Sequence, residues 1–204
     1  MILVGRFGSP FVRRVGITLR LYGIAHEHRP LSGAVPEERI ELQKVNPLAR
    51  VPALVTDDGE ALVDSATILD YLDRLVGPEK ALTPAGGPER TKVMALIGLA
   101  VGAVEKSIGA YYELGRRPAD KVHKPWLDML LEQSKDGFEA VENMAAAPWL
   151  TGERMTQADV STVAFLDFAM QNRPADAPPL DCPKLTALAK RANEMPEFAE
   201  TNPY

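Results

Sequence analysis

Short β-strand patterns occur only in about the first 75 residues of this 204-residue chain, and this is what most restricts its possible folds. Beyond residue 88, apolar residues recur at helical spacing and strand patterns nearly vanish. The stretch between them, residues 77–88, is rich in Gly and Pro, which is typical of a connector. We therefore predict two domains, residues 1–80 with strands and helices and residues 88–204 with helices alone.

Four short strands and three helices are predicted in the first domain. The strands lie at about residues 1–4, 27–31, 53–55 and 61–63, and the helices at about residues 10–22, 36–45 and 65–75. Asp57-Asp58-Gly59 separates the last two strands and is a strong hairpin signal. The expected order is thus βαβ followed by ββα.

The second domain is predicted to contain four helices. They lie at about residues 89–114 and 125–144, from about residue 156 onward, and at about residues 183–195. Thr156 and Asp159 have the spacing of a capping box, in which each side chain satisfies an amide of the first helical turn. The residues that follow are apolar on most sides of the helix, so we expect it to lie at the centre of a bundle.

Composition and charge exclude several function classes. The net charge of -5 and the scattered basic residues argue against a nucleic-acid partner, which needs a concentrated basic face. The longest nearly unbroken apolar run, residues 93–104, is too short to span a bilayer, so no membrane association is predicted. The N-terminus lacks the features of a signal peptide, which makes the cytoplasm the expected location.

The thiol and imidazole groups give no metal or disulfide signal. Cys182 is the single cysteine, which excludes an intrachain disulfide framework, and its position before Pro183 favours a structural thiol over a nucleophile. His26 and His28 would share one face of a strand, but they lack a matching third ligand. We therefore predict no metal site.

Ser9 lies directly after the first strand, at the start of a predicted helix. It is a good N-cap, and Pro10 suits the first helical position because its missing N–H costs nothing there. The same placement would let a hydroxyl face an anionic sulfur at the helix N-terminus. These residues alone leave both interpretations open.

Several motifs occur in one order along the whole chain. They are Ser9-Pro10-Phe11, residues 46–54 (Asn-Pro-Leu-Ala-Arg-Val-Pro-Ala-Leu), Asp64-Ser65, residues 149–152, Thr156 to Asp159, and the terminal segments 183–185 and 195–198. Together with the βαβ-ββα order they resemble the glutathione S-transferase family. The resemblance implies an α/β plus all-α fold, with an N-terminal thioredoxin-like domain and a C-terminal helical bundle.

The resemblance also implies a site for glutathione, as co-substrate and without a metal. In the family, the residue before a cis-proline lends its backbone to the cysteinyl unit, and here that pair is Val51-Pro52, which could otherwise be an ordinary trans turn. Asp64 and Ser65 match the pair that takes the ammonium and the γ-glutamyl carboxylate, a role compatible with capping. The resemblance also places Phe11 among the residues that bind glutathione. Arg50 is a candidate partner for the glycine carboxylate, although a solvated arginine is an equal alternative.

Ser9 matches the position at which the family carries a serine or a cysteine. A serine can donate a hydrogen bond to the glutathione thiolate, worth about 1.5 to 3 kcal/mol, which would bring a thiol pKa near 8.5 to about 7 or below. Val12 replaces a second redox cysteine, and a thiol reductase would need a cysteine at position 9. The predicted function is therefore transfer of glutathione to small hydrophobic electrophiles, as in EC 2.5.1.18, in a detoxification role.

Other functions stay open at this point. Dehalogenation, isomerisation and peroxide reduction would use the same thiolate, and a non-catalytic glutathione transferase-like binding or regulatory protein is the alternative from another class. The electrophile pocket is expected between the domains, near the residues Ser107, Tyr111, Tyr112 and Leu114 of the long helix. A homodimer is expected by resemblance to the family.

Overall fold

The computed structural model describes all residues from Met1 to Tyr204 and divides into two compact units. The first comprises Met1–Ala85 and Asn193–Tyr204, and the second comprises Gly86–Ala192. The sequence placed the C-terminal segment with the helical domain, whereas the structure groups it with the first unit. Two polar contacts hold it there: Arg13 Nη2 donates to Asn193 Oδ1 at 2.7 Å, and Arg20 pairs with Glu200 at 3.2 Å.

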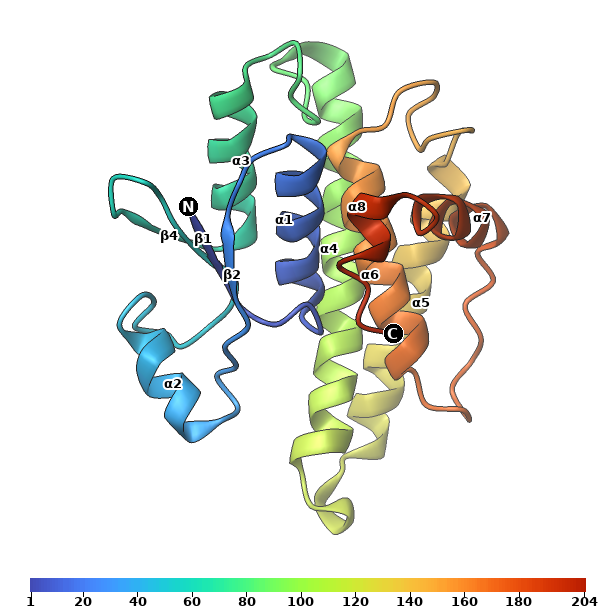
Figure 1. Cartoon of the computed structure of the whole chain (residues 1–204). Helices are drawn as coiled ribbons and strands as arrows, with labels where there is room; N and C mark the ends of the chain where they lie inside the picture. The colour runs from blue at the N-terminus through green and yellow to red at the C-terminus, as the bar shows by residue number, and fades with distance from the viewer. The chain divides into compact units, whose positions relative to one another are not determined.

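The first unit contains a four-stranded sheet with helices on both faces (Figure 1). Its elements are β1 (Ile2–Val4), α1 (Pro10–Leu21), β2 (Glu27–Arg29), α2 (Pro36–Gln43), β3 (Ala53–Val55), β4 (Ala61–Val63), α3 (Ser65–Val76) and α8 (Pro196–Ala199). The strand order is β2-β1-β3-β4, in which β1 is parallel to β2 and antiparallel to β3, and β4 is antiparallel to β3. The predicted thioredoxin-like βαβ-ββα domain is confirmed.

Alternation along the central strands separates the two faces of this sheet. Leu3 of β1 and Leu54 of β3 pack into a cluster with apolar residues of α1 and α3. The neighbouring residues, Val4 and Ala53, point to the other face and pack against Leu42 near the end of α2. Both faces of β1 and β3 are therefore buried, which fixes the register of the central strands.

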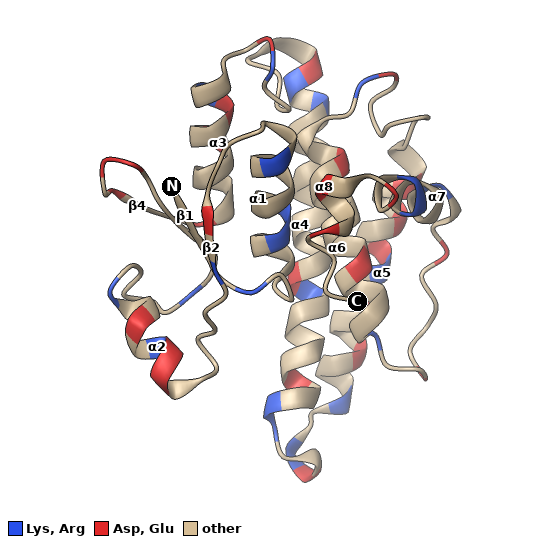
Figure 2. Cartoon of the chain, in the orientation of Figure 1, with Lys and Arg blue, Asp and Glu red and all other residues tan.

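Helix α1 is buried on more sides than its sequence pattern indicated. Val15, Leu19 and Tyr22 recur at helical spacing, and Arg13 and Arg14 lie off that apolar stripe. Even so, only 1% and 3% of the surfaces of these two arginines are exposed. The sheet, α3 and α8 all pack against α1, so its polar positions are covered as well. Figure 2 shows the basic bands on this helix. A buried charge is costly unless polar groups face it, so these arginines need partners.

The second unit is entirely helical, as predicted. Its elements are α4 (Gly87–Arg116), the short 3₁₀ helix η1 (Ala119–Lys121), α5 (Lys124–Met144), α6 (Gln157–Asn172) and α7 (Pro183–Ala192). Helix α4 packs against α5 and α6, and α6 also packs against α7. The single helix predicted at about residues 183–195 is wrong at its end: α7 stops at Ala192 and Pro196 begins the separate α8.

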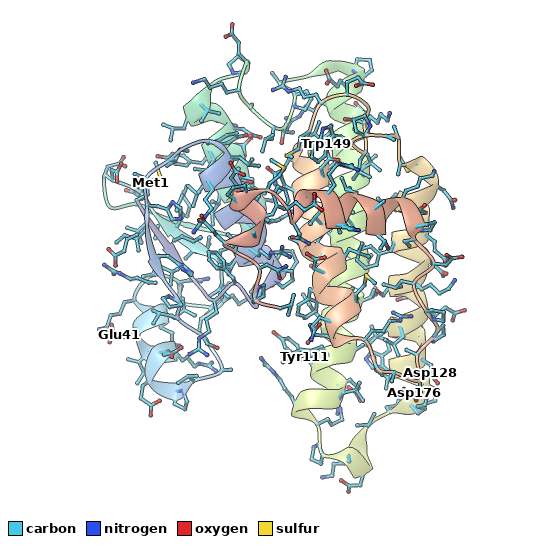
Figure 3. The ribbon with its side chains drawn as sticks, turned by 45° about the vertical axis from the view of Figure 1, so that its right-hand side comes forward. Met1, Glu41, Tyr111, Asp128, Trp149 and Asp176 are labelled. Carbon is cyan, nitrogen blue, oxygen red and sulfur yellow. The ribbon has the colours of Figure 1, made fainter.

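Helix α6 forms the core of this unit, because most of its residues from Gln157 to Ala169 are buried. The predicted capping box between Thr156 and Asp159 is present. Asp159 also accepts a hydrogen bond from the Leu150 amide at 2.7 Å, which ties the preceding loop to the helix. The same loop carries Trp149, which is labelled in Figure 3. The guanidinium of Arg191, from α7, lies 5.1 Å from the centre of the Trp149 ring.

Helix α4 is much longer than the apolar run at residues 93–104 that was considered in the sequence. By length and composition alone it could cross a membrane, a property that core helices of soluble proteins share. One side of it is buried against the neighbouring helices, including Leu96, Ala103 and Val104. At Gly137 of α5, an added Cβ would lie 2.8 Å from the Cβ of Ala103, so the two helices approach closely there.

Candidate functional site

Strand register brings the predicted site segments to one edge of the sheet. Ala53, the first residue of β3, pairs with Val4 at the end of β1 and with Val63 at the end of β4. The loop that carries Ser9, the segment before β3 and the start of α3 therefore all leave the sheet at this edge. Gly5 allows close approach there: its φ is +131°, and an added Cβ would lie 2.8 Å from the Cβ of Val51.

Ser9 occupies the N-cap position of α1, but its side chain does not cap the helix. Its N–H donates to the carbonyl of Arg6, and its own carbonyl accepts from the amide of Arg13, each at 3.0 Å. The hydroxyl is half-buried and forms no hydrogen bond within the chain. Capping thus explains the backbone of Ser9 but leaves its hydroxyl able to donate to a ligand at the helix N-terminus.

Val51 and Pro52 are joined by a cis peptide bond, as the resemblance implies. The N–H and C=O of Val51 form no hydrogen bond within the chain, so they can pair with an extended ligand as an added strand would. Buried Asn46 shapes this loop: its Nδ2 donates to the Arg50 carbonyl at 2.8 Å and its Oδ1 accepts from the Leu48 amide at 3.1 Å. The Arg50 side chain is exposed and has no ion pair, so its role stays a prediction.

Asp64 and Ser65 form the start of α3. Asp64 has φ +71°, which is uncommon outside glycine, and strained backbone of this kind is concentrated at functional sites. Its exposed carboxylate accepts from the Ala66 amide at 2.8 Å, so the capping expectation is correct for Asp64. The amides of Ser65 and Thr67 remain unpaired within the chain. Such free amides at a helix N-terminus favour an anion.

Arg14 is a site residue that the sequence reasoning missed. Its Nη2 donates to Ser65 Oγ at 2.6 Å, and both residues are buried. Burial lowers the pKa of the Arg14 guanidinium to about 10, while the nearby Asp64 carboxylate opposes that shift. Phe11 covers the guanidinium, with its ring centroid 5.4 Å away. The sequence contained one signal for Arg14, its spacing from the predicted site residue Phe11. Residues three apart on a helix share a face, and Arg14 follows Phe11 by three.

Three of the residues predicted near the electrophile pocket contact other side chains of the helical unit. The ring of Tyr111, labelled in Figure 3, meets Phe168 edge-on at 5.8 Å, and Arg116 lies 3.8 Å from the ring of Tyr112. Ser107 does not fit its expected place, because it is buried and its Oγ bonds Ser134 Oγ at 2.7 Å between α4 and α5. That expectation overlooked how closely these two helices pack.

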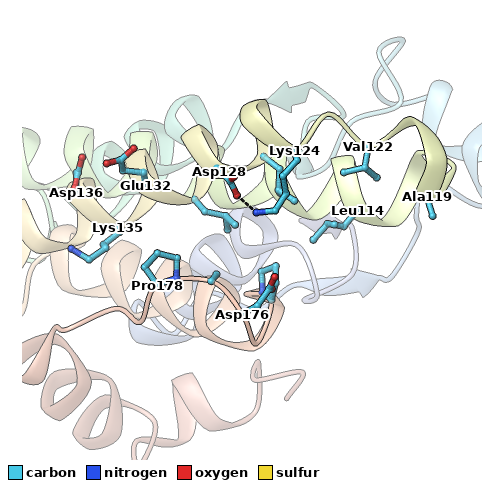
Figure 4. Close-up of a pocket in the computed structure, with 14 residues that line it drawn as sticks. Leu114, Ala119, Val122, Lys124, Asp128, Glu132, Lys135, Asp136, Asp176 and Pro178 are labelled. Atoms are coloured by element: carbon cyan, nitrogen blue, oxygen red, sulfur yellow. Dashed lines mark hydrogen bonds and ion pairs between the residues drawn. The ribbon is translucent and has the colours of Figure 1, made fainter.

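A separate cavity of about 650 Å³ lies within the helical unit (Figure 4). Its walls include Leu114 and Leu131, and the loop carrying Asp176 and Pro178 faces them. Lys124 at its edge is paired with Asp128. None of the residues predicted to bind glutathione lines this cavity, and no group of His, Cys, Asp or Glu in the structure could hold a metal ion.

Comparisons with known proteins show the family to which the chain belongs. Residues 3–80 match the family model described as "Glutathione S-transferase, N-terminal domain", and residues 105–200 match "Glutathione S-transferase, C-terminal domain". A crystal structure of a glutathione transferase family member from Pseudomonas fluorescens Pf-5, with bound glutathione, is 30% identical with a TM-score of 0.85 and covers 100% of this chain and 98% of that chain. The chain belongs to the glutathione S-transferase family.

Curated relatives of this family member differ in what is recorded for them. The "Uncharacterized GST-like protein YibF" of Escherichia coli (strain K12) is 28% identical over 204 residues, covering 100% of this chain and 98% of the relative. A maleylacetoacetate isomerase of Pseudomonas aeruginosa is also 28% identical, over 201 residues, covering 93% of this chain and 90% of the relative. Family membership therefore leaves the reaction to be argued from the site.

Proposed function

We propose that the protein binds glutathione and activates its thiol for attack on small hydrophobic electrophiles, with Ser9 as the catalytic residue. One observation carries this proposal: the Ser9 hydroxyl lies at the N-terminus of α1 and forms no hydrogen bond within the chain. A hydroxyl donor and a helix N-terminus both favour a thiolate over a thiol. The glutathione bound in the Pseudomonas fluorescens relative supports the choice of co-substrate.

The other groups of the tripeptide fit the same edge of the sheet. The unpaired amides at the start of α3 suit the γ-glutamyl carboxylate, and the exposed Asp64 carboxylate suits its ammonium. The free backbone groups of Val51 suit the cysteinyl unit. Arg50 is assigned to the glycine carboxylate because its guanidinium is exposed beside Val51 and unpaired in the chain.

The proposed reaction needs no cofactor besides glutathione. The glutathione thiol loses its proton to solvent while Ser9 stabilises the thiolate that remains. Sulfur then forms a bond to the electrophilic carbon, and the leaving group departs with the electrons of the broken bond, or a double bond accepts them and is later protonated. Ser9 acts by donating a hydrogen bond and does not become covalently modified.

The test is the thiol pKa of bound glutathione, followed by thiolate absorbance across a pH series. Ser9→Ala should raise this pKa by about one unit or more, because a hydrogen bond to a charged acceptor is worth about 1.5 to 3 kcal/mol. Ser32→Ala is the matched control, since Ser32 is also half-buried in this unit but its hydroxyl accepts from the Ala34 amide. An unchanged thiol pKa in Ser9→Ala would refute the role given to Ser9.

Isomerisation is a second candidate, favoured by the likeness to the Pseudomonas aeruginosa maleylacetoacetate isomerase. The same thiolate would add to a cis double bond and leave again after rotation, so glutathione would be regenerated. Parallel assays with a conjugation panel and with a cis-unsaturated diacid, each followed for glutathione consumption, separate the two reactions. Tight glutathione binding with no turnover in either assay would instead support a binding or regulatory protein.

Assembly and location follow from the family expectation as proposals. We propose a homodimer in the cytoplasm, with a role in detoxification. Light scattering during gel filtration measures the assembly directly, and a monomer at micromolar concentration would contradict the dimer.

A further inference from the structure

Two adjacent arginines in α1 are buried to the same degree but have different hydrogen-bond partners. Arg13 is 1% exposed and donates to Asn193 Oδ1 at 2.7 Å, which links α1 to the C-terminal segment. Arg14 is 3% exposed and donates to Ser65 Oγ at 2.6 Å, at the first turn of α3. Only Arg14 thus reaches the helix N-terminus assigned above to the γ-glutamyl carboxylate.

The Arg14 contact determines what the Ser65 hydroxyl can do. An arginine is only a donor, so Ser65 Oγ accepts from Arg14 and its own proton must point elsewhere. The Ser65 hydroxyl donates no hydrogen bond within the chain, although Ser65 is buried. The hydroxyl is therefore left as a donor beside the unpaired amides of Ser65 and Thr67.

The positive charge of Arg14 also favours a carboxylate at the N-terminus of α3. The guanidinium is buried, where solvent screens it weakly, and Phe11 covers it. The opposing charge that lies nearby is the Asp64 carboxylate, which is exposed and bonded to the Ala66 amide. An incoming carboxylate at the N-terminus of α3 would meet the donors first and the positive charge of Arg14 behind them.

We infer that Arg14 is a positioning residue for the γ-glutamyl end of glutathione: it holds Ser65 Oγ as an acceptor and so directs the Ser65 hydroxyl and a fixed positive charge toward the ligand carboxylate. Phe11 then acts through Arg14, by covering its guanidinium. This inference rests on the proposed function, since it concerns the same glutathione site. Arg14 should therefore affect the binding of the γ-glutamyl end of glutathione without affecting the thiol at the other part of the site.

The test compares two ligands by calorimetric titration: glutathione, and cysteinylglycine, which lacks the γ-glutamyl unit. In Arg14→Met, the affinity for glutathione should fall about 10- to 100-fold, while the affinity for cysteinylglycine should change less than about 2-fold. Arg13→Met is the matched control, because it removes an equally buried guanidinium from the next position of the same helix. It should lower stability without changing the ratio of the two affinities.

Two further variants keep the test decisive. Arg14→Lys retains the charge but lacks the planar donor fork, so it should recover part of the preference for glutathione. Ser65→Ala should lose affinity for glutathione, and combining it with Arg14→Met should cost less than the sum of the single losses. If Arg14→Met alone unfolds, the Arg14→Lys and Ser65→Ala proteins still test the contact, because thermal unfolding with and without each ligand reports binding in both of them.

The outcomes separate this inference from the proposed function. If the wild-type protein fails to bind glutathione, the proposed function is wrong. If the wild-type protein binds it and Arg14→Met weakens both ligands equally, or Arg13→Met alters the preference as strongly, then Arg14 has only a structural role and the inference is overturned.

Discussion

Replacing Asp159 by Ala removes the acceptor that joins α6 to the loop before it. The side chain is fully buried, and three groups donate to it: the Leu150 amide at 2.7 Å, the Thr156 amide at 2.8 Å and the Thr156 hydroxyl at 2.9 Å. Ala keeps the helix propensity but accepts none of these bonds. The Thr156 hydroxyl can rotate to another partner, whereas the two amides are fixed by the backbone.

The expected cost follows from the two stranded amides. Each buried donor left without a partner costs about 1 to 3 kcal/mol. The burial of a carboxylate at this position is itself unfavourable, and its removal returns part of that cost. We expect a net loss of about 3 kcal/mol, which corresponds to a fall in Tm of about 6 to 12 °C for a chain of this size.

Chemical denaturation with urea and a thermal scan by circular dichroism measure this loss. Asp120→Ala is the control, because Asp120 is an exposed carboxylate of the same unit and its removal should change stability by less than about 0.5 kcal/mol. A loss in Asp159→Ala as small as in this control would contradict the argument from buried amides.

The pH dependence of the stability difference between wild type and Asp159→Ala gives a second prediction. Burial raises the pKa of Asp159, although the hydrogen bonds from Leu150 and Thr156 oppose this. A folded-state pKa above the unfolded value of about 3.9 means that protonation favours the folded state. The stability of wild type relative to Asp159→Ala should therefore increase as pH falls through the folded pKa and decrease as pH rises through it. The opposite trend between about pH 7 and about pH 4 would show that the hydrogen bonds outweigh burial.

Three further predictions concern packing and reactivity. Gly137→Ala should destabilise the helical unit by about 1 to 3 kcal/mol in urea denaturation, because its Cβ would lie 2.8 Å from that of Ala103, whereas Gly98→Ala, with no atom within 4 Å, should stabilise it slightly. Gly5→Ala should lower both stability and glutathione affinity, since φ is +131° and the new Cβ would meet Val12 at 2.5 Å; unchanged affinity would contradict the close approach. Cys182 is buried and its pKa is raised to about 11, mainly by burial and by Glu142, so it should react with Ellman's reagent at about pH 8 only after unfolding.

The sequence alone determined the order of the strands and α-helices except at the C-terminus, where α7 and α8 were expected as one helix. The hairpin at Asp57-Asp58-Gly59 joins β3 and β4 as predicted, because turn residues act locally. The capping box of Thr156 and Asp159 was likewise readable, since its two residues are neighbours in one helical turn. The motif order was enough to indicate the family, which the comparisons confirm.

Only the tertiary structure decided how distant segments combine. Arg13 and Arg14 lie off the apolar stripe of α1, but the tertiary structure, in which the sheet, α3 and α8 pack against this helix, buries both. Their partners, Asn193 and Ser65, are far away in the sequence, and no local pattern reports such a pairing. For Ser9, the sequence determined its place at the start of a helix, whereas the fold decided that its hydroxyl does not cap that helix. Periodicity describes one element at a time, whereas burial and hydrogen bonding depend on what other elements bring to it.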